Sequence, residues 1–443
     1  MKPFTVVAML AVLGMVVAGW AQAAAPVGQP AAAATAAVPP DAKLAVWMSQ
    51  AYIEGADAFN RSQYEDWSKK TGVPVDVSYI SPDQFDSKFR AALEAPETLP
   101  DIVQFDEIFF PLFYEAGKLI DISDVIADLS KSEGGISPGL IVGYTFDGKT
   151  YAVPWIVDPQ LSYFRKDVFE AAGTTVPTTY DQFLEECKKV NKPPEMYCWG
   201  LNLNNNADPE AGMRALIWSL GGTVTDKTGT KATLDTPEVL KALQYVKAHN
   251  DIGSFPPDAI SGDGVANNNW YETGITAFTE NGGSIATWLL TNDPEAYTKT
   301  VVTTPLAGPA GAFMNSNVWT LGITTNSKYP DLAKQALEYI AGPEATLAYL
   351  KFVQYTQVSA YAEVAKQPII QEDPLRKTAF ETVAGTRSLA WPAPLSTAAT
   401  EIYSQNILSK MAIAILSGKT PEEAAAEGQQ AVQTILDRHA KSK

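Results

Sequence analysis

The sequence is poor in histidine, cysteine and basic residues. Its 443 residues include two His and two Cys, and 33 Lys plus Arg against 50 Asp plus Glu give a formal net charge of −17. Two His leave little room for a His-based zinc site or a histidine general base. An acidic surface repels phosphate backbones and anionic lipids, which argues against nucleic-acid binding and membrane docking. We therefore expect no metal, no cofactor and no nucleic-acid partner.

Aromatic and hydrophobic residues, by contrast, are abundant. The chain has ten Trp and eighteen Tyr, and 46% of its residues are hydrophobic. This composition is typical of a folded globular protein and not of a disordered chain. Because a single hydrophobic core stops growing at about 250 to 300 residues, the length of the chain favours two domains.

The first 23 residues have the pattern of a secretory signal. Lys2 supplies a positive charge, residues 4–18 are apolar, and Ala21 to Ala23 form an A-x-A cleavage site. The apolar run is shorter than the roughly 20 residues that a membrane span needs, which argues against a membrane anchor. We predict export to the periplasm with cleavage near Ala23, followed by a tether rich in Ala and Pro over residues 24–40.

Cys187 and Cys198 would meet an oxidising compartment in an exported protein, so a disulfide between them is our leading interpretation. The bond would join the end of a helix predicted over residues 180–190 to the start of a strand. By the loop-entropy model it would stabilise the fold by roughly 2 to 3 kcal/mol. Two buried free thiols are the alternative.

Strand and helix patterns alternate along the chain. Residues 43–48, 73–80 and 101–105 predict strands, separated by a helix that ends at Gly72 and a helix over residues 82–93. Thr and Pro residues that favour helix starts precede or occupy positions 180, 237, 330 and 421. Strands and helices in such succession indicate an α/β fold with parallel strand pairs.

Two segments match functional motifs only by letter. Residues 143–150 fit the P-loop pattern, but Asp147-Gly148 is a hairpin turn signal and no helix is predicted to follow. Residues 135–139 fit the G-x-S-x-G pattern of a nucleophile elbow, but the polar flank and Pro138 predict a loop. Neither segment therefore supports nucleotide binding or nucleophilic catalysis.

Five further segments follow one another in a recognisable order. They are LPDIVQFD with LFYEAGKLIDI (residues 99–122), DGKTYAVPWIVDPQLSYFRKDVF (147–169), AFTENGGSIATW (277–288), PLAGPAG through SKYPDLAKQALEYIAGPEA (305–345) and LSGKTPEEA (416–424). In this order the chain resembles the extracellular solute-binding proteins of carbohydrate ABC importers, the group that includes maltose-binding protein. Residues 281–283 and 314–317 depart from the family pattern near the expected ligand, so the resemblance leaves the particular sugar open.

The resemblance implies a two-lobed periplasmic binding protein fold of type II, with the ligand in the cleft between two α/β lobes. We expect an N-terminal lobe from residues 41–155 and 300–355 and a C-terminal lobe from residues 156–299 and 356–443. The implied function is to bind a sugar or sugar derivative and deliver it to an ABC permease by hinge closure. We expect a monomer without enzymatic activity.

A sugar-binding cleft needs aromatic rings for the apolar faces of the sugar, and carboxylates and amides for its hydroxyls. In α/β sheets such groups lie outside the carboxyl ends of strands. Strand ends and the resemblance together give the candidate residues Trp47, Gln50, Asp106, Glu107, Trp155, Asp158, Trp218, Trp270, Trp288, Asn315, Asn317, Arg387 and Trp391. A buried core position suits Trp47, Trp218 and Trp270 equally well.

Two other functions stay open at this point. The same fold could bind a polyamine, since carboxylates and aromatic rings also recognise amines. A secreted carbohydrate-active enzyme could use Asp106 and Asp158 as acid and base. Arg387, if it faced the ligand, would favour an anionic sugar.

Overall fold

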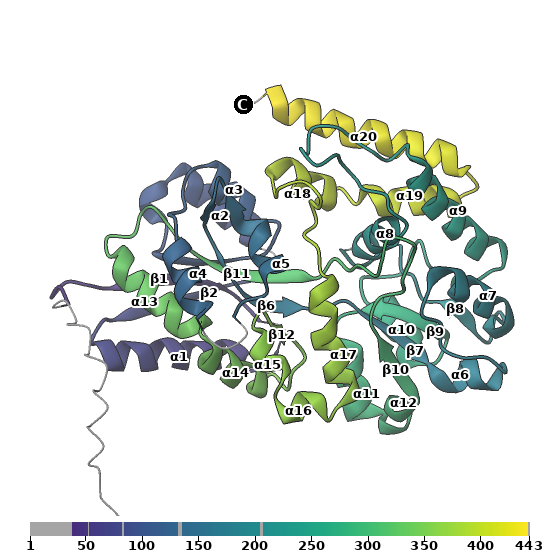
Figure 1. Cartoon of the computed structure of the whole chain (residues 1–443), viewed down its shortest axis with the longest axis horizontal. Helices are drawn as coiled ribbons and strands as arrows, with labels where there is room; N and C mark the ends of the chain where they lie inside the picture. The colour runs from purple at the N-terminus through teal and green to yellow at the C-terminus, as the bar shows by residue number, and fades with distance from the viewer. Residues whose placement is uncertain (1–37, 52, 82–83, 132–134, 204–206, 442–443) are drawn as a thin grey trace, which may run out of the picture. The chain divides into compact units, whose positions relative to one another are not determined.

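The computed structural model describes residues 38–51, 53–81, 84–131, 135–203 and 207–441 (Figure 1). The predicted signal peptide and most of the predicted tether lie outside these residues. Residues 41–443 form one compact unit, which holds all the helices and strands discussed below. Within the described part of the chain, no helix combines the length and apolarity needed to cross a membrane.

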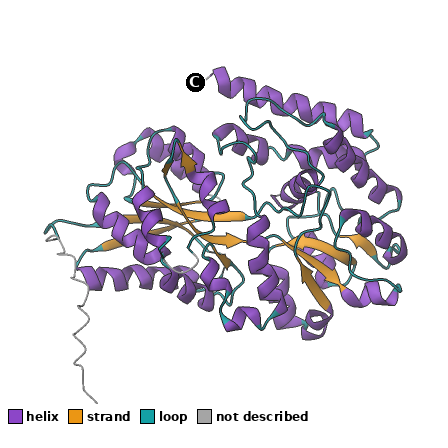
Figure 2. Ribbon diagram, in the orientation of Figure 1, coloured by secondary structure: helices purple, strands orange, loops and turns teal. Residues whose placement is uncertain are grey.

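A six-stranded sheet organises the first half of the unit (Figure 2). In spatial order its strands are β12 (Val358–Ser359), β6 (Val153–Asp158), β11 (Asn317–Ile323), β3 (Ile102–Phe105), β1 (Leu44–Ser49) and β2 (Val75–Ile80). β1 pairs in parallel with β2 and β3, as the alternating strand and helix patterns predicted. β11 comes from the second half of the sequence and lies antiparallel between β3 and β6.

A four-stranded sheet organises the second half. Its strands, in spatial order, are β10 (Thr300–Thr303), β7 (Leu161–Arg165), β9 (Thr276–Asn281) and β8 (Tyr197–Trp199). We call the six-stranded sheet with its helices lobe 1 and the four-stranded sheet with its helices lobe 2. A short hairpin of β4 (Thr145–Phe146) and β5 (Lys149–Thr150) belongs to neither sheet.

Two strands lie on the other side of the lobe boundaries that the sequence suggested. β10 pairs with β7, so residues 300–303 belong to the sheet of lobe 2. β12 pairs with β6, so residues 358–359 belong to the sheet of lobe 1. The predicted boundaries at residues 300 and 356 are therefore misplaced by these short strands. The reason is physical: each strand completes a sheet edge before the chain crosses, and edge pairing leaves no local signal in the sequence.

Helices cover both sheets. Around lobe 1 lie α1 (Ala56–Thr71), α2 (Phe85–Glu94), α3 (Phe110–Glu115), α4 (Ser123–Leu129), α5 (Pro138–Ile141), α13 (Pro330–Ala341), α14 (Pro343–Phe352), α15 (Ala362–Ala365), α16 (Pro368–Gln371) and α17 (Pro374–Thr382). Around lobe 2 lie α6 (Lys166–Ala171), α7 (Tyr180–Val190), α8 (Ala207–Ser219), α9 (Pro237–Asp251), α10 (Ala266–Glu272), α11 (Ser284–Asn292), α12 (Pro294–Lys299), α18 (Thr397–Ser404), α19 (Ile407–Leu416) and α20 (Pro421–Lys441). α17 contacts both β12 and β10 and thus touches both sheets. Single 3-10 turns occur at Pro96–Thr98, Val142–Tyr144 and Val383–Gly385.

The helix ends follow the local signals in the sequence. Gly72 ends α1 with φ +77°, a left-handed conformation that glycine adopts without a Cβ clash. The hydroxyl of Thr179 accepts a hydrogen bond from the backbone N–H of Gln182 at the start of α7. Pro occupies the first turn of α9 and α13. These predicted helix boundaries are confirmed.

The predicted disulfide is present. Cys187 in α7 and Cys198 in β8 are bonded, with their Cα atoms 5.4 Å apart, so the alternative of two free thiols is wrong. Both cysteines are fully buried beside Phe183 and Trp199 in the hydrophobic core of lobe 2. The bond therefore fastens a helix to its sheet inside lobe 2.

The structure excludes a P-loop at residues 143–150 and a nucleophile elbow at residues 135–139, but it corrects one detail of the second segment. Asp147 and Gly148 form the β4–β5 turn with positive φ, and a strand follows where a P-loop needs a helix. Residue 137 was predicted to lie in a loop, but the short helix α5 begins directly after it. Pro at the first helical position favours that helical turn. Ile136 makes only an isolated bridge to Tyr361, so the buried strand of a nucleophile elbow is missing.

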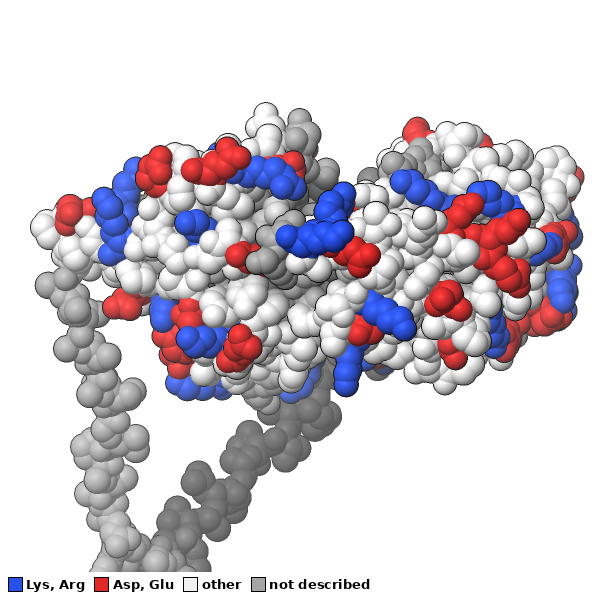
Figure 3. Space-filling view, turned by 90° about the horizontal axis from the view of Figure 1, so that it is seen from above, with Lys and Arg blue, Asp and Glu red and all other residues white. Residues whose placement is uncertain are grey.

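Charged side chains are intermixed on the face seen in Figure 3, where Lys and Arg lie among Asp and Glu. Among the described residues of the molecule, exposed ion pairs on helices include Lys247 with Asp251 and Lys299 with Glu295. Exposed pairs of this kind stabilise a fold by less than about 1 kcal/mol each. On this face a group of acidic side chains lies at the right of the view, with basic side chains beside it.

Candidate ligand-binding site

A cavity of about 550 Å³ lies where the strands of lobe 1 face helix α11 of lobe 2. This volume is within the range of small-molecule sites. The cavity is lined by Ser49, Gln50, Ala51, Ile53, Asn60, Gln104, Trp155, Ile156, Asp158, Gly282, Gly283, Ser284, Thr287, Trp288, Thr291, Asn292, Trp319, Tyr349, Thr356 and Gln357. Ser49 and Gln50 follow the carboxyl end of β1, which is the edge where a parallel sheet offers a site.

Four aromatic side chains give the cavity its apolar surfaces. Trp155, Trp319 and Tyr349 come from lobe 1, and Trp288 comes from α11 of lobe 2. Trp155 is almost fully buried, and its Nε1–H donates to Thr346 Oγ1 at 3.1 Å. Trp288 is 39% exposed, so a ring face is free for a ligand. Aromatic surface therefore lies on both sides of the cavity.

Asp158 anchors a chain of hydrogen bonds along the lobe 1 side. Its Oδ2 accepts from Trp319 Nε1 at 2.5 Å, and its Oδ1 accepts from Gln357 Nε2 at 2.6 Å. The Tyr349 hydroxyl in turn donates to Gln357 Oε1 at 2.9 Å. Because an ionised carboxylate only accepts, it fixes the orientation of the Gln357 amide and so makes Tyr349 a donor. Burial raises the pKa of Asp158, whereas hydrogen bonds from Gln357, Trp319 and Asn317 oppose that rise.

The described part of the cavity wall contains one charged side chain, that of Asp158, and no Lys, Arg or His. Most of its other polar groups are amides and hydroxyls. No group of three or more His, Cys, Asp and Glu side chains in the described residues is arranged to hold a metal ion. The cavity therefore presents neutral donors and acceptors between aromatic rings, which is the chemistry that a polyhydroxylated neutral molecule needs.

Four of the predicted site residues line this cavity, namely Gln50, Trp155, Asp158 and Trp288. Asn317 is their neighbour, since it pairs with Asp158 across β11 and β6 and its side chain hydrogen-bonds the carboxylate. These five predicted residues come from four separate segments of the sequence. The structure brings them together at one edge of the lobe 1 sheet and the start of α11.

A second group of predicted residues gathers away from this cavity. Glu107 Oε2 accepts the backbone N–H of Leu389 at 2.9 Å, and Asn315 Nδ2 donates to the carbonyl of Arg387 at 3.2 Å. The Arg387 guanidinium lies 5.0 Å from the ring centre of Phe313 and donates to backbone carbonyls of its own loop. We call Asp106, Glu107, Trp218, Asn315, Arg387 and Trp391 the Glu107 cluster.

Aromatic packing and backbone hydrogen bonds occupy the rest of the Glu107 cluster. Trp391 stacks on Phe313 and meets the ring of the fully buried Trp218 edge-on at 5.8 Å. Asp106 Oδ1 accepts the backbone N–H groups of Ile108 and Phe109 at 2.9 and 3.0 Å. Arg387 is thus engaged with its own loop, which removes the argument for an anionic ligand. None of the six residues lines the cavity around Asp158.

Burial perturbs both carboxylates of the Glu107 cluster. Desolvation raises the pKa of Glu107 to about 8, although the Leu389 N–H and the Arg214 charge act against the rise. Desolvation likewise raises the pKa of Asp106 to about 6, against its backbone hydrogen bonds. Glu107 is therefore largely a neutral acid at pH 7. Its side chain is buried.

Two predicted tryptophans occupy core or surface positions instead of the cavity. Trp270 of α10 is 6% exposed and belongs to the hydrophobic core of lobe 2. Trp47 of β1 packs parallel to Phe89, and the Lys88 ammonium covers its ring at 4.4 Å from the centre. Trp47 points to the opposite face of the sheet from the neighbouring side chains, as alternation along a strand requires. Neither ring therefore lines the cavity around Asp158.

Several cavity residues were not predicted, among them Asn60, Gln104, Thr287, Trp319, Tyr349 and Gln357. Trp319 had a signal in the sequence, because it lies two positions after Asn317 on the same strand and so on the same face. Asn60 and Tyr349 are buried residues of α1 and α14, and an amphipathic helix pattern gives no reason to assign them to a site. Their role follows only from tertiary packing, in which α1 lies against β2 and α14, and α14 lies against β12.

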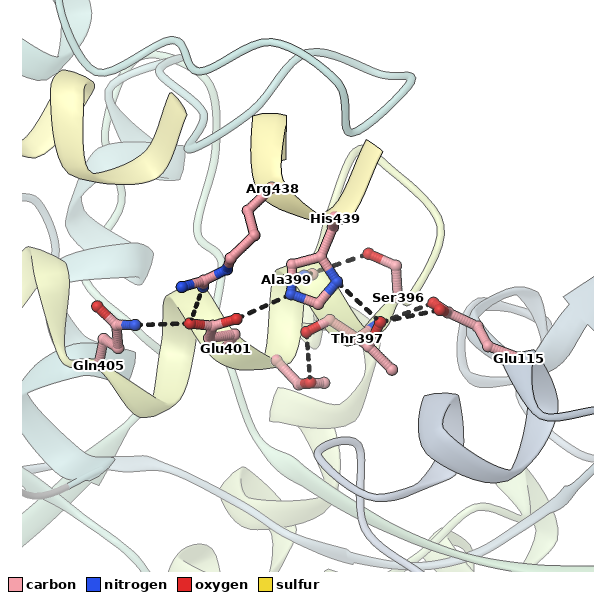
Figure 4. Close-up of polar contacts among 9 residues, drawn as sticks. Glu115, Ser396, Thr397, Ala399, Glu401, Gln405, Arg438 and His439 are labelled. Carbon is pink, nitrogen blue, oxygen red and sulfur yellow. Dashed lines mark hydrogen bonds and ion pairs between the residues drawn. The ribbon is translucent and has the colours of Figure 1, made fainter. Parts of the chain in front are cut away.

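A polar contact between α3 and α18 also joins the two lobes (Figure 4). Glu115 at the end of α3 accepts hydrogen bonds from the backbone N–H and the hydroxyl of Thr397, both at 2.8 Å. Thr397 begins α18, and His439 of α20 lies between Thr397 Oγ1 and Glu401. Burial acts to raise the pKa of Glu401, but hydrogen bonds and charges from His439 and Arg438 outweigh burial and lower this pKa. A lobe 1 carboxylate thus holds the start of a lobe 2 helix.

Comparisons with known proteins agree with this architecture. The diacetylchitobiose binding protein DasA of Streptomyces coelicolor is 24% identical over 395 residues, which are 86% of this chain and 87% of that protein. The sugar-binding protein MalE of Xanthomonas citri superposes with a TM-score of 0.78 at 20% identity, over 90% of this chain and 98% of that one. The cyclic α-maltosyl-1,6-maltose binding protein of Arthrobacter globiformis superposes with a TM-score of 0.76 at 19% identity, over 89% and 99%.

These structures confirm the predicted two-lobed α/β fold, and the relatives are binding proteins by name. The sequence model of the family described as bacterial extracellular solute-binding protein matches residues 50–347, which is more than half of the chain. The match covers most of lobe 1 and the α11 side of the cavity. This chain belongs to the family of bacterial extracellular solute-binding proteins.

Proposed function

We propose that this protein binds a neutral carbohydrate in the cavity around Asp158 and Trp288 and delivers it to the permease of an ABC transporter. The observation that carries the proposal is the wall of the cavity, with aromatic rings from both lobes, amides and hydroxyls, and a single carboxylate. The names of the similar proteins, which describe them as binding diacetylchitobiose, cyclic α-maltosyl-1,6-maltose or a sugar, support the same class of ligand.

Each part of the wall has a defined task in this proposal. The Trp288 ring covers the apolar face of a sugar ring, since aromatic side chains offer large flat surfaces. Gln50, Thr287 and Asn292 offer donors and acceptors to the hydroxyls around the rim. The carboxylate of Asp158 already accepts hydrogen bonds from Trp319, Gln357 and Asn317, and its remaining lone pair suits one ligand hydroxyl.

Closure of the lobes around the ligand follows from where these groups lie. Trp288 and Thr287 belong to α11 of lobe 2, whereas Asp158 and Gln50 belong to lobe 1. A ligand that contacts both sides favours the conformation in which the two sides are close. In our proposal this closed form is the one that the permease recognises, and the protein acts as a monomer in the periplasm after cleavage of the signal near Ala23.

The two alternative functions have less support from the site. A polyamine carries several positive charges, but Asp158 is the single charged side chain in the described wall of the cavity and can neutralise one of them. An enzyme using Asp106 and Asp158 as acid and base needs both carboxylates at one substrate. Asp106 instead caps the backbone N–H groups at the start of α3 and does not line the cavity.

A thermal-shift screen of the purified protein tests the proposal. The panel contains maltose, N,N′-diacetylchitobiose, tagatose and mannitol as neutral ligands, glucuronic acid as an anion and spermidine as an amine. A ligand that binds only the native state raises its stability by about 2.7 kcal/mol at a hundredfold excess over its Kd. We expect at least one neutral sugar to raise the Tm, with affinity that is almost independent of salt.

Two results would contradict the proposal. The first is stabilisation by spermidine that disappears between 50 and about 500 mM salt, since screening weakens ion pairs. The second is release of shorter sugars from an oligosaccharide, which would indicate an enzyme. Isothermal titration of the best ligand then gives the reference affinity for the variants described below.

A further inference from the structure

Gly283 lies at a close approach between the two sides of the cavity. It precedes α11, and a Cβ atom built on it would lie 2.4 Å from the backbone carbonyl oxygen of Thr356. Ordinary contacts of a Cβ atom begin at 3.4 Å, so any side chain at this position has to move the helix or the carbonyl by about 1 Å. The φ of Gly283 is −68°, which any residue adopts. Space, and not backbone conformation, therefore requires glycine here.

The carbonyl that faces Gly283 belongs to a tightly held turn. Gln354 and Tyr355 both have positive φ, 54° and 60°, which is costly for residues other than glycine. The N–H of Tyr355 donates to the carbonyl of Leu350 at 2.8 Å, and the Thr356 hydroxyl donates to the carbonyl of Val353 at 2.9 Å. A turn with these bonds and dihedral angles resists displacement. A side chain at residue 283 would therefore move α11 more readily than it moves the turn.

The contact also separates two cavities. Gly283, Thr287 and Thr356 line both the main cavity and a second cavity of about 50 Å³ behind it. Thr287 is fixed to the same point, since its N–H and its hydroxyl both donate to the carbonyl of Gly283. Trp288 follows next in the helix. The position of the aromatic platform therefore depends on where α11 rests against the turn that carries Gln357, the partner of Asp158.

We propose that Gly283 is a positioning residue: its missing side chain lets α11 rest on the Thr356 carbonyl, and this contact sets the distance between Trp288 and the Asp158 hydrogen-bond chain. The effect on affinity rests on the proposed function, because the distance between Trp288 and Asp158 affects affinity only if the cavity is the ligand site. It concerns a departure from the family pattern that the sequence already displayed at residues 281–283.

A distance measurement without ligand tests the geometric part. The only two cysteines form the buried disulfide, so Glu54→Cys and Leu290→Cys place nitroxide labels selectively. Both positions are exposed; one precedes α1 in lobe 1, and the other lies on α11. In Gly283→Ala we expect electron–electron double resonance to give a mean label distance longer by at least the 1 Å of clash relief. An unchanged distance would overturn the proposal.

Two glycine variants serve as matched controls. Gly308→Ala also meets a backbone carbonyl, that of Ser219 at 2.2 Å, but inside lobe 2 and away from the cavity. Gly264→Ala meets no atom within 4 Å. We expect Gly308→Ala to lower the Tm while its ligand affinity and label distance stay unchanged. Gly264→Ala should change none of the three. A role of Gly283 in stability alone would make its variant behave like Gly308→Ala.

Affinity completes the test, with the neutral sugar that most raises the Tm of the wild type as the probe. We expect Gly283→Ala to bind it at least tenfold more weakly, and binding within twofold of wild type would overturn the proposal. If no sugar binds the wild type, the proposed function fails, whereas the label distance still decides the role of Gly283.

A second variant covers a failure of Gly283→Ala to fold. Thr356→Ala adds no atom and removes the hydroxyl bond that holds the turn. We expect a broader label distance distribution in the absence of ligand, since the carbonyl is then less firmly placed. A distribution as narrow as that of the wild type would overturn the proposal.

Discussion

The cavity around Asp158 and the Glu107 cluster contain the same kinds of residue and use them differently. Both combine a buried or partly buried carboxylate with amides and tryptophans. In the Glu107 cluster the carboxylate accepts a backbone N–H and the rings pack on one another. In the cavity the carboxylate fixes a chain of side chains that ends on open space.

The difference lies in what completes each group. In the Glu107 cluster the hydrogen bonds of Asp106, Glu107 and Asn315 go to backbone groups of the protein. The bond of Glu107 connects the β3–α3 turn to the loop at residues 386–391. In the cavity, the ring of Trp288 stays partly exposed. The described cavity wall contains no basic side chain that could pair with Asp158. Residue types alone therefore do not mark a ligand site; unoccupied space beside them does.

The largest effect is expected from removing a ring on each side of this comparison. Trp288→Ala should weaken binding of the reference sugar by about 30- to 100-fold, because a ring of this size contributes roughly 2 to 3 kcal/mol of contact. Its Tm should hardly change, since the ring is exposed. Isothermal titration and thermal melts measure the two quantities.

Trp391→Ala is the matched change in the Glu107 cluster. It removes packing against Phe313 and Trp218, so we expect a loss of about 2 kcal/mol of stability. Affinity per folded molecule should stay within threefold of wild type. The comparison between the two regions breaks if Trp391→Ala loses affinity and Trp288→Ala does not.

The next effect concerns the two aspartates. Asp158→Asn places an amide N–H₂ against either the Trp319 indole N–H or the Gln357 amide, so one buried donor loses its acceptor. Such a loss costs about 1 to 3 kcal/mol, and we expect binding to weaken by about tenfold or more. In Asp106→Asn a single carbonyl oxygen still accepts both backbone N–H groups. Equal affinities of the two variants would contradict our assignment of the cavity.

A smaller effect is expected in the pH dependence of stability. The folded-state pKa of Glu107 is about 8, above the ordinary value of 4.5, so the folded state binds this proton more tightly than the unfolded state. The free energy of unfolding must then fall as pH rises from about 4.5 to about 8. Between pH 6 and 7.5 the loss from this group is about 1 to 2 kcal/mol.

Glu107→Gln keeps an acceptor for the Leu389 N–H and cannot ionise. We expect its denaturant midpoint to fall less steeply with pH than that of the wild type, and ligand affinity to be unaffected. Parallel pH profiles in the two proteins would show that Glu107 is ionised throughout and that its burial is tolerated by another route.

The smallest effect is expected at the contact between α3 and α18. Glu115 is exposed, and Glu115→Gln still accepts one of the two hydrogen bonds from Thr397. We expect a change below about 0.5 kcal/mol in stability and no change in affinity. A clear gain or loss of affinity would instead indicate that this contact between the lobes helps to set the cavity.

The elements of the fold were predictable because their signals are local. The Thr179 cap, the Gly72 stop, the apolar run of β1 and the alternation of β2 each depend on a few neighbouring residues. Edge strands β10 and β12 were not predictable in this way. They pair with strands more than a hundred residues away and contain only four and two residues.

The site was predictable only where a strand end indicated it. Gln50 and Asp158 end strands at the ligand edge of the sheet, and Trp288 came from the family resemblance. Glu107 ends a strand as well, but its partner is the N–H of Leu389, 282 residues later. No pattern near Glu107 distinguishes a carboxylate that meets a ligand from one that meets a distant backbone group.

The order of strands in lobe 1 has a consequence for how the molecule is made. Its sheet contains β1 at residues 44–49 and β12 at residues 358–359, and lobe 2 is completed only by α18 to α20 at the end of the described chain. Neither lobe can therefore be completed until most of the polypeptide has been synthesised. No early segment can fold into a finished lobe ahead of the rest.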